Sequence, residues 1–170
     1  MGGREASPEK MAATLERLAA ALRVTGKEQL GPRVVVGRPV EDNRGGWRVI
    51  PVEHIAYAFR GSMAHENRIG SQLPRGVTFD PDGVYVRTAK GVFLTRYATF
   101  QALETLLPPE RFGHLHRSIV VNRRWPGLVM DLERTVKVPV AGGGLDVLHG
   151  SRRKFEEFTE WYGLNGTHFK

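Results

Sequence analysis

The stretch His116-Arg117-Ser118-Ile119-Val120-Val121-Asn122, followed directly by Arg123 and Arg124, carries the most information about the fold. Its apolar run, placed between polar groups, predicts a buried β-strand over residues 116–121. The end of that strand brings one amide and two guanidinium groups together. Asn and Arg are the side chains that form two-point hydrogen bonds with adenine and guanine edges, respectively. No common catalytic signature uses this set, so the segment favours nucleic-acid recognition over catalysis.

Further strands and three helices are predicted around this segment. Apolar runs and alternations indicate strands over residues 33–37, 47–50, 54–59, 83–88, 91–95, 128–132, 136–140 and 145–148. Helices are expected over about 7–24, 99–107 and 151–162, the last capped by Ser151. Because the strands do not alternate with helices, we expect a mainly antiparallel β domain with added helices rather than a doubly wound parallel sheet.

Residues 60–81 contain three Gly, two Pro and scattered charges without a clear period. This composition predicts a long loop, with a short strand at Val77–Phe79 as an option. Loops of this length in compact domains are usually functional or disordered.

The composition narrows the class of protein. With 170 residues, the chain is long enough for one domain or one domain with an extension. Its 25 Lys and Arg against 18 Asp and Glu give a net charge of +7, which favours a polyanionic partner. The absence of Cys excludes disulfides, thiolate catalysis and Cys-based zinc sites. No apolar run is long enough to span a membrane and the first residues lack a signal peptide's apolar core, so a cytoplasmic location is expected.

An apolar stripe marks the predicted N-terminal helix. Met11, Leu15, Leu18 and Leu22 follow the spacing of one helix face. The stripe either packs on the body of its own chain or forms a homodimer contact, and the sequence leaves both alternatives open.

Several segments, in order, resemble the LytTR DNA-binding domain, the output domain of many bacterial response regulators. The segments are Pro51–Tyr57, Val84–Val86, Gly91–Thr95, Phe100–Leu103, Leu107–Phe112, His116–Asn122 and Ser151–Arg153. The resemblance covers roughly residues 47–158, and the His-Arg-Ser-x-x-Val-Asn element after Pro-Pro is its most specific part. It implies an elongated, mostly antiparallel β structure with a small internal helix, whose loops enter successive major grooves.

The resemblance also implies a division of the chain and a partner. Residues 1–46 are expected to form a helical extension, 47–163 the DNA-binding domain with an enlarged loop at 60–81, and 164–170 a tail. Some 46 residues before Trp47 are too few for a receiver domain, so a stand-alone member is expected. The expected function is a sequence-specific regulator of transcription that binds double-stranded DNA, typically at spaced direct repeats.

Ten site residues follow from these arguments. The base-contacting set is Asn122, Arg123 and Arg152. The residues expected to contact phosphates or to support the base-contacting residues are Tyr85, Arg87, Lys90, Arg117, Arg124, Ser151 and Arg153. A tip around Asp82–Tyr85 corresponds to a further reading loop of the family but aligns poorly, because residues 60–81 are longer than usual there. The alternative for Asn122 is a strand-end side chain that bonds its own turn, and for the cations a solvated surface.

Other functions find less support. His114 and His116 share a strand face but have no third ligand at a suitable spacing, so no metal and no cofactor are expected. Ser118 has no base partner, and no acid–base pair or phosphate loop is present, so an enzyme is not expected. Gly142-Gly143-Gly144 is a turn. The remaining alternative is a sensor of a small ligand or protein, held at residues 1–46 or 60–81, on which DNA binding depends.

Overall fold

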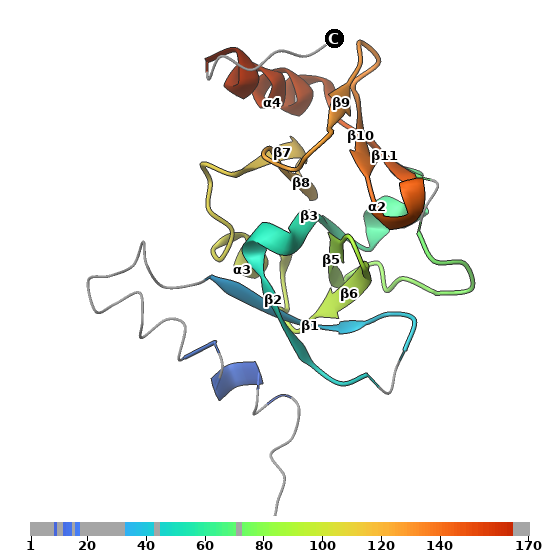
Figure 1. Cartoon of the computed structure of the whole chain (residues 1–170), viewed down its shortest axis with the longest axis vertical. Coiled ribbons are helices and arrows are strands. Elements are labelled where there is room, and N and C mark those ends of the chain that lie inside the picture. The colour runs from blue at the N-terminus through green and yellow to red at the C-terminus, as the bar shows by residue number, and fades with distance from the viewer. Residues whose placement is uncertain are drawn as a thin grey trace, which may run out of the picture.

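The computed structural model describes residues 9, 12–14, 16–17, 33–42, 45–70 and 73–164, and it is built mainly of short antiparallel strands (Figure 1). The strands are β1 (Val34–Pro39), β2 (Arg48–Pro51), β3 (Ile55–Arg60), β4 (Ile69–Gly70), β5 (Val84–Thr88), β6 (Gly91–Thr95), β7 (Phe112–His116), β8 (Ile119–Asn122), β9 (Val129–Met130), β10 (Thr135–Pro139) and β11 (Leu145–His149). The helices are α2 (Ser62–His65), α3 (Phe100–Glu104) and α4 (Arg152–Leu164), with short 3-10 turns at η2 (Val52–His54) and η3 (Ala141–Gly143).

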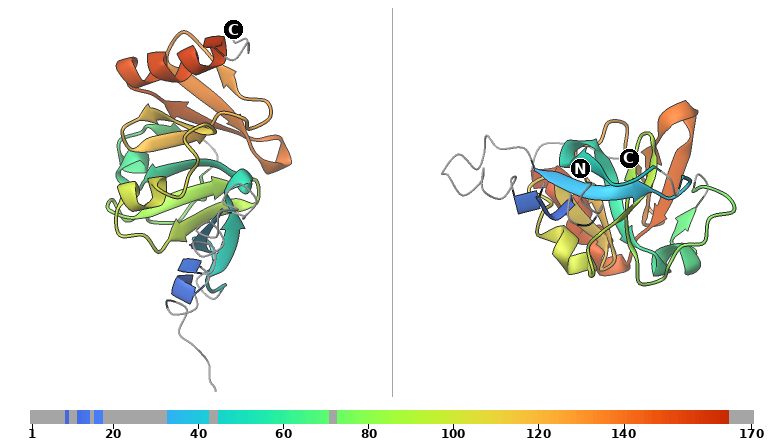
Figure 2. Two further views of the ribbon diagram at one scale, coloured as in Figure 1. Left: turned by 90° about the vertical axis from the view of Figure 1, so that its left-hand side faces the viewer. Right: turned by 90° about the horizontal axis from the view of Figure 1, so that it is seen from below.

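The strands form two sheets. One has seven strands in the order β2-β1-β6-β5-β3-β8-β7, and the other has four in the order β4-β11-β10-β9. The strands of the larger sheet follow one another along the long axis of the molecule, and α4 lies beyond β7 at one end (Figures 1 and 2). The molecule is therefore elongated and mainly antiparallel β, as expected.

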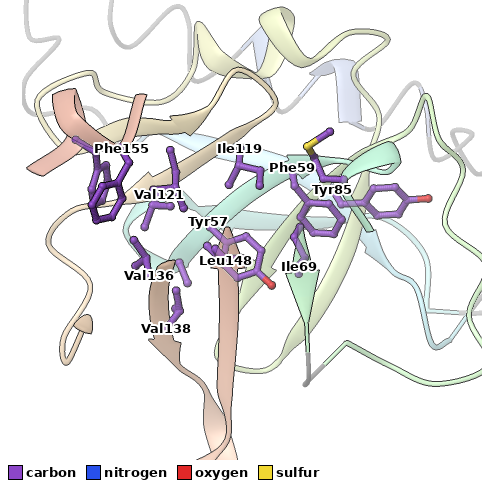
Figure 3. Packing of buried hydrophobic residues seen from close by; sticks show 14 of the residues in the cluster. Tyr57, Phe59, Ile69, Tyr85, Ile119, Val121, Val136, Val138, Leu148 and Phe155 are labelled. Atoms are coloured by element: carbon purple, nitrogen blue, oxygen red, sulfur yellow. The ribbon is translucent and has the colours of Figure 1, made fainter. Parts of the chain in front are cut away.

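Successive residues of a strand point to opposite faces of the sheet. Both faces of the larger sheet are covered by other parts of the chain. Val86, Ala58 and Val120 face α3 and pack on Phe100 and Leu103. On the other face, Tyr57, Phe59 and Val121 pack against the smaller sheet and α4 (Figure 3). A register shift between Ile55 and Tyr57 in β3 explains why residues 55 and 57 face opposite sides.

The stretch His116–Asn122 is a hairpin and not one strand. β7 ends at His116, Arg117 and Ser118 form the turn, and β8 begins at Ile119. The predicted strand was therefore wrong at its start. The turn places Arg117 at the tip of the hairpin, and the backbone of Asn122 roughly 15 Å away along β8.

Two other expectations change. β1 pairs with β2 and β6, so residues 34–39 belong to the large sheet and not to an N-terminal extension. The segment 60–81 contains α2 and β4, which pairs with β11, while Val77–Phe79 is not a strand. The predicted long loop is thus partly built into the smaller sheet.

The described residues between Glu9 and Arg17 are helical, as expected for this segment. Glu16 forms an ion pair with Arg96, which joins this segment to the body. The stripe residues Met11, Leu15, Leu18 and Leu22 lie outside the described residues, as does the tail beyond Leu164. Within the described chain, no helix combines the length and apolar character needed to cross a membrane.

Candidate nucleic-acid interface

Three chain segments meet where β3 ends, β5 begins and the β7–β8 hairpin turns. Arg60 pairs with Val84 in the sheet and donates its backbone N–H to Ser118 O over 3.1 Å. Gly61 donates to Gly83 O over 2.9 Å. Arg60, residues 82–83 and the turn that carries Arg117 therefore lie close together at one end of the strands of the larger sheet.

The start of α4 lies at the same end of the strands. Ser151 donates its backbone N–H to Leu115 O over 3.0 Å, beside the end of β7. This close contact between the two segments requires glycine at position 150, because a Cβ there would clash with Leu115, 2.9 Å from its Cδ1 and O. Gly150 also donates to Arg134 O over 2.8 Å, which brings the β9–β10 turn alongside. His149 donates to Arg68 O over 2.9 Å.

These contacts gather six arginines from five separate segments. We call this set the arginine edge: Arg60, Arg68, Arg117, Arg134, Arg152 and Arg153. Arg117, Arg134, Arg152 and Arg153 are exposed, and the first three form no ion pair with any described residue. Glu66, Asp82 and Glu133 are carboxylates of the same segments. Arg60 bonds Asp82 at 2.9 Å and Arg153 bonds Glu157 at 3.5 Å, both in solvent-exposed pairs that contribute little to stability.

His116 supports the hairpin turn from within. Its Nδ1 accepts a hydrogen bond from Ser118 N over 3.1 Å, so that nitrogen carries no proton. Burial lowers the pKa of His116, and the nearby Arg68 and Arg117 lower it further, while Glu66 opposes them. These effects favour the neutral ring, whose Nδ1 holds the backbone of the turn that presents Arg117.

The β9–β10 turn is held in one conformation and exposes an apolar side chain. Asp131 Oδ1 accepts from the backbone of Glu133 over 2.9 Å and of Thr135 over 3.2 Å. Hydrogen bonding from the Thr135 hydroxyl lowers the pKa of Asp131. Leu132 is 92% exposed at the tip, and Arg134 has a φ of +65°, a conformation that costs a non-glycine residue roughly 1 kcal/mol.

Asn122 occupies the opposite end of β8 from the arginine edge and is only 2% exposed. Its Nδ2 donates to Ile55 O over 3.0 Å, and its Oδ1 accepts from Arg124 N over 3.0 Å. Both ends of the amide are therefore engaged by the protein's own backbone. In this structure Asn122 fixes the turn at residues 122–125 and does not face outward, so we do not propose it as a base reader.

Arg123 is packed beneath α4. Its guanidinium carbon lies 5.1 Å from the ring centre of Trp161 and 5.5 Å from that of Phe158. The group covers Gly113, where a Cβ would lie 2.3 Å from it. Burial lowers the pKa of Arg123, and Tyr162 donates to Arg123 O over 2.6 Å. The Arg123 cation, which was expected to contact a base, packs against the aromatic rings of α4.

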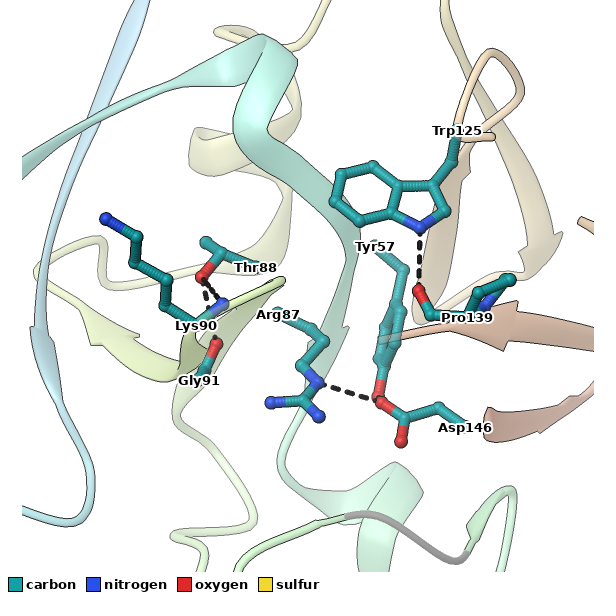
Figure 4. A network of polar contacts seen from close by, with 8 residues as sticks. All are labelled: Tyr57, Arg87, Thr88, Lys90, Gly91, Trp125, Pro139 and Asp146. Carbon is teal, nitrogen blue, oxygen red and sulfur yellow. Dashed lines mark hydrogen bonds and ion pairs between the residues drawn. The ribbon is translucent and has the colours of Figure 1, made fainter. Parts of the chain in front are cut away.

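Tyr85 and Arg87, which were expected to contact phosphates or to support the base-contacting residues, also face inward. The Tyr85 hydroxyl accepts from Asp80 N over 2.8 Å, and its ring stacks on Phe59. Arg87 is 7% exposed and bonds the buried Asp146 (Figure 4). The alternation along β5 correctly placed these side chains on one face, but that face is covered by the smaller sheet.

The remaining predicted residues divide between the two ends of the sheet. Lys90 and Arg124 are exposed, but they lie at the Asn122 end. Ser151 directly precedes α4, and its hydroxyl is 3.4 Å from Lys154 N. Sequence analysis missed Arg60, Arg68, Leu132 and Arg134, because only sheet pairing and the contacts of Gly150 bring their segments beside α4. In the part of the chain that is described, no three His, Asp or Glu side chains gather as metal ligands.

Comparison with known proteins identifies the fold. No family model matches the sequence, and no curated protein matches it. Among solved structures, the chain is similar to a LytTr DNA-binding domain from Bacillus cereus, described as part of a methyl-accepting/DNA response regulator. The two share 21% identity with a TM-score of 0.51, over 78% of this chain and 99% of that domain. The chain therefore has the LytTR fold, as the sequence resemblance predicted.

Proposed function

We propose that this chain is a sequence-specific regulator of transcription that binds double-stranded DNA through its arginine edge. The observation that carries the proposal is the convergence of Arg117, Arg134 and Arg152, all exposed and without an ion-pair partner among the described residues. The likeness to a domain described as DNA-binding supports it. Exposed guanidinium groups neutralise backbone phosphates and form two-point hydrogen bonds with guanine.

Within this edge, Arg117 and Arg152 are the proposed base readers. Arg117 lies in a two-residue turn and Arg152 is the first residue of α4, and both side chains are exposed. The start of α4 carries Arg152 and Arg153, which oppose the helix dipole in the absence of an anion. A phosphate at this helix start removes that opposition, since the free N–H groups there bind anions. Ser151 and Arg153 are the proposed phosphate contacts.

The β9–β10 turn extends the proposed interface. Arg134 and Leu132 combine a cation with an exposed apolar side chain on a turn fixed by Asp131. Proteins that enter the minor groove use arginine in this way and insert an apolar wedge between base steps. We assign this turn to the groove next to the one that Arg152 enters. The site pattern expected for such a regulator is a spaced direct repeat, and its location is the bacterial cytoplasm.

Selection of bound sequences from a random duplex pool tests the proposal. About 150 mM salt weakens non-specific electrostatic binding, so enrichment then reports sequence reading. The wild-type chain should enrich a spaced motif, and Arg117→Ala/Arg152→Ala should lose it. The matched control is Lys90→Ala/Arg124→Ala, which removes two exposed cations from the other end of the sheet and should keep the motif. If Lys90→Ala/Arg124→Ala loses the motif while Arg117→Ala/Arg152→Ala keeps it, the assigned DNA-binding face is wrong. If the wild-type chain enriches no motif, the proposed sequence-specific DNA binding is wrong.

A further inference from the structure

A cleft of about 740 Å³ lies at the end of the sheet opposite the arginine edge. Its walls come from the β2–η2 segment, the β5–β6 turn and the residues that follow β8. Asn122 and Arg124 line it, whereas Arg117, at the other end of the same hairpin, does not. The proposed DNA contacts therefore leave this cleft unused.

The floor of the cleft is apolar and aromatic. Ile50, Pro51, Phe93, Trp125 and Pro126 contribute to its lining, and Val49 is a 41% exposed apolar side chain beside them. Trp125 is held in place because its indole N–H donates to Pro139 O over 2.9 Å (Figure 4). A surface of this kind offers a flat ring a place to stack without first reorganising.

The rim of the cleft is cationic. Its charged residues are Arg48, Lys90, Arg111 and Arg124, against the single carboxylate Glu53. None of the four cations forms an ion pair with any residue in 33–42, 45–70 or 73–164.

Two of these cations stand on fixed turns. Lys90 N donates to Thr88 Oγ1 over 3.1 Å, and Arg124 N donates to Asn122 Oδ1 over 3.0 Å. Unpaired cations above an apolar floor complement an anion that has an apolar body.

We propose that this cleft binds a small aromatic carboxylate, with its ring against Phe93 and Trp125 and its carboxylate at the Lys90 and Arg124 rim. The volume lies within the range of pockets that enclose small organic ligands. A charge-assisted contact from an exposed ammonium or guanidinium selects the anion, while the floor selects the ring. The sequence left a ligand sensor at residues 60–81 open as an alternative, and the cleft proposed here lies outside that segment.

Calorimetric titration of the full chain with 2-naphthoate tests this site, with methyl 2-naphthoate as the neutral probe of the same shape. We expect one molecule of 2-naphthoate to bind per chain and the neutral ester to bind at least about tenfold more weakly. Lys90→Glu/Arg124→Glu should weaken 2-naphthoate by a similar factor. Arg75→Glu reverses an exposed cation that does not line the cleft and should bind as the wild-type chain does.

Val49→Glu gives a second, independent test, because it places a carboxylate at the floor from an exposed position that tolerates a polar group. It should abolish binding while leaving the circular dichroism spectrum unchanged. Equal binding of acid and ester, equal weakening in Arg75→Glu, or no heat with 2-naphthoate would each overturn the proposal. DNA selection is measured separately, so failure here leaves the proposed regulator function standing, and failure there leaves this site standing.

Discussion

Arg87 and Asp146, 59 positions apart in the chain, meet at 2.9 Å between the two sheets. Asp146 is fully buried on β11, and its Oδ2 also accepts from the Tyr57 hydroxyl of β3 over 2.7 Å. Burial raises the pKa of Tyr57 well above its ordinary value, and the neighbouring carboxylate raises it further. The phenol thus remains a hydrogen-bond donor. This network joins the smaller sheet to the larger one and buries the Arg87 side chain between them.

Breaking this pair should be costly. Asp146→Ala leaves the Arg87 cation buried without its partner, and we expect the free energy of unfolding to fall by about 3–5 kcal/mol. Arg87→Met/Asp146→Leu removes both charges and should recover much of that stability. Urea unfolding measures both. Arg60→Met, which breaks the exposed pair with Asp82, is the control and should change stability by about 1 kcal/mol or less. A double variant as unstable as Asp146→Ala would contradict this account.

Asn122→Ala should act on stability and not on sequence reading. The substitution leaves the buried Ile55 O and Arg124 N without their partner, which should lower the free energy of unfolding by about 1–3 kcal/mol. Denaturant unfolding measures this change, and binding to the selected duplex at a temperature where the variant is folded measures recognition. Unchanged stability together with an abolished sequence preference would restore Asn122 as a base reader.

The salt dependence of DNA affinity should distinguish phosphate-binding residues from base readers. Removing one cation that neutralises a phosphate reduces the slope of log K against log salt by about 0.9. Arg153→Ala should therefore weaken all sequences alike and flatten the slope. Arg152→Ala should instead cost about 1–3 kcal/mol on the selected site alone. If Arg124→Ala, at the far end of the sheet, flattens the slope as much as Arg153→Ala does, the assigned face is incorrect.

Stability should decrease as the pH falls from 7 to 5, in part through His116. Its folded-state pKa is lowered, so below the ordinary value of 6.5 the unfolded chain binds the proton more readily than the folded chain. The contribution of neutral His116 to the free energy of unfolding is fully present above about pH 6.5. It is lost as the pH falls through the lowered pKa of His116 in the folded chain. His116→Asn should reduce the slope of unfolding free energy against pH in this window. An identical slope in the variant would rule out His116 as its source.

Leu132→Ser should leave stability nearly unchanged, within about 0.5 kcal/mol, because the side chain is 92% exposed. If Leu132 is a wedge between base steps, the variant should bend the selected duplex less than wild type does. Energy transfer between dyes at the two duplex ends measures the bend. Val129→Ser, which alters a half-exposed apolar residue on β9 away from the tip, is the matched control. Equal bending by wild type and Leu132→Ser would exclude the wedge.

Much of the local structure follows from the sequence. Thr99 caps α3 by accepting from Ala102 N over 3.1 Å, and the hairpin of β5 and β6 falls where the alternation predicted it. The start of α4 after Ser151 also agrees with the prediction. Caps, turns and apolar periods act between residues a few positions apart, so they can be read from the chain directly.

Taken alone, the sequence establishes a mainly β, basic chain with a LytTR-like order of elements and with arginines at 117, 152 and 153. Which polar side chains face solvent depends on the packing of the two sheets and α4. Asn122, Arg123 and Arg87 looked like surface residues, yet Ile55, α4 and Asp146 cover them. Conversely, Arg134 joins the arginine edge through Gly150. The physical reason is that burial depends on which distant segments pack together, and sequence spacing carries no direct record of those contacts.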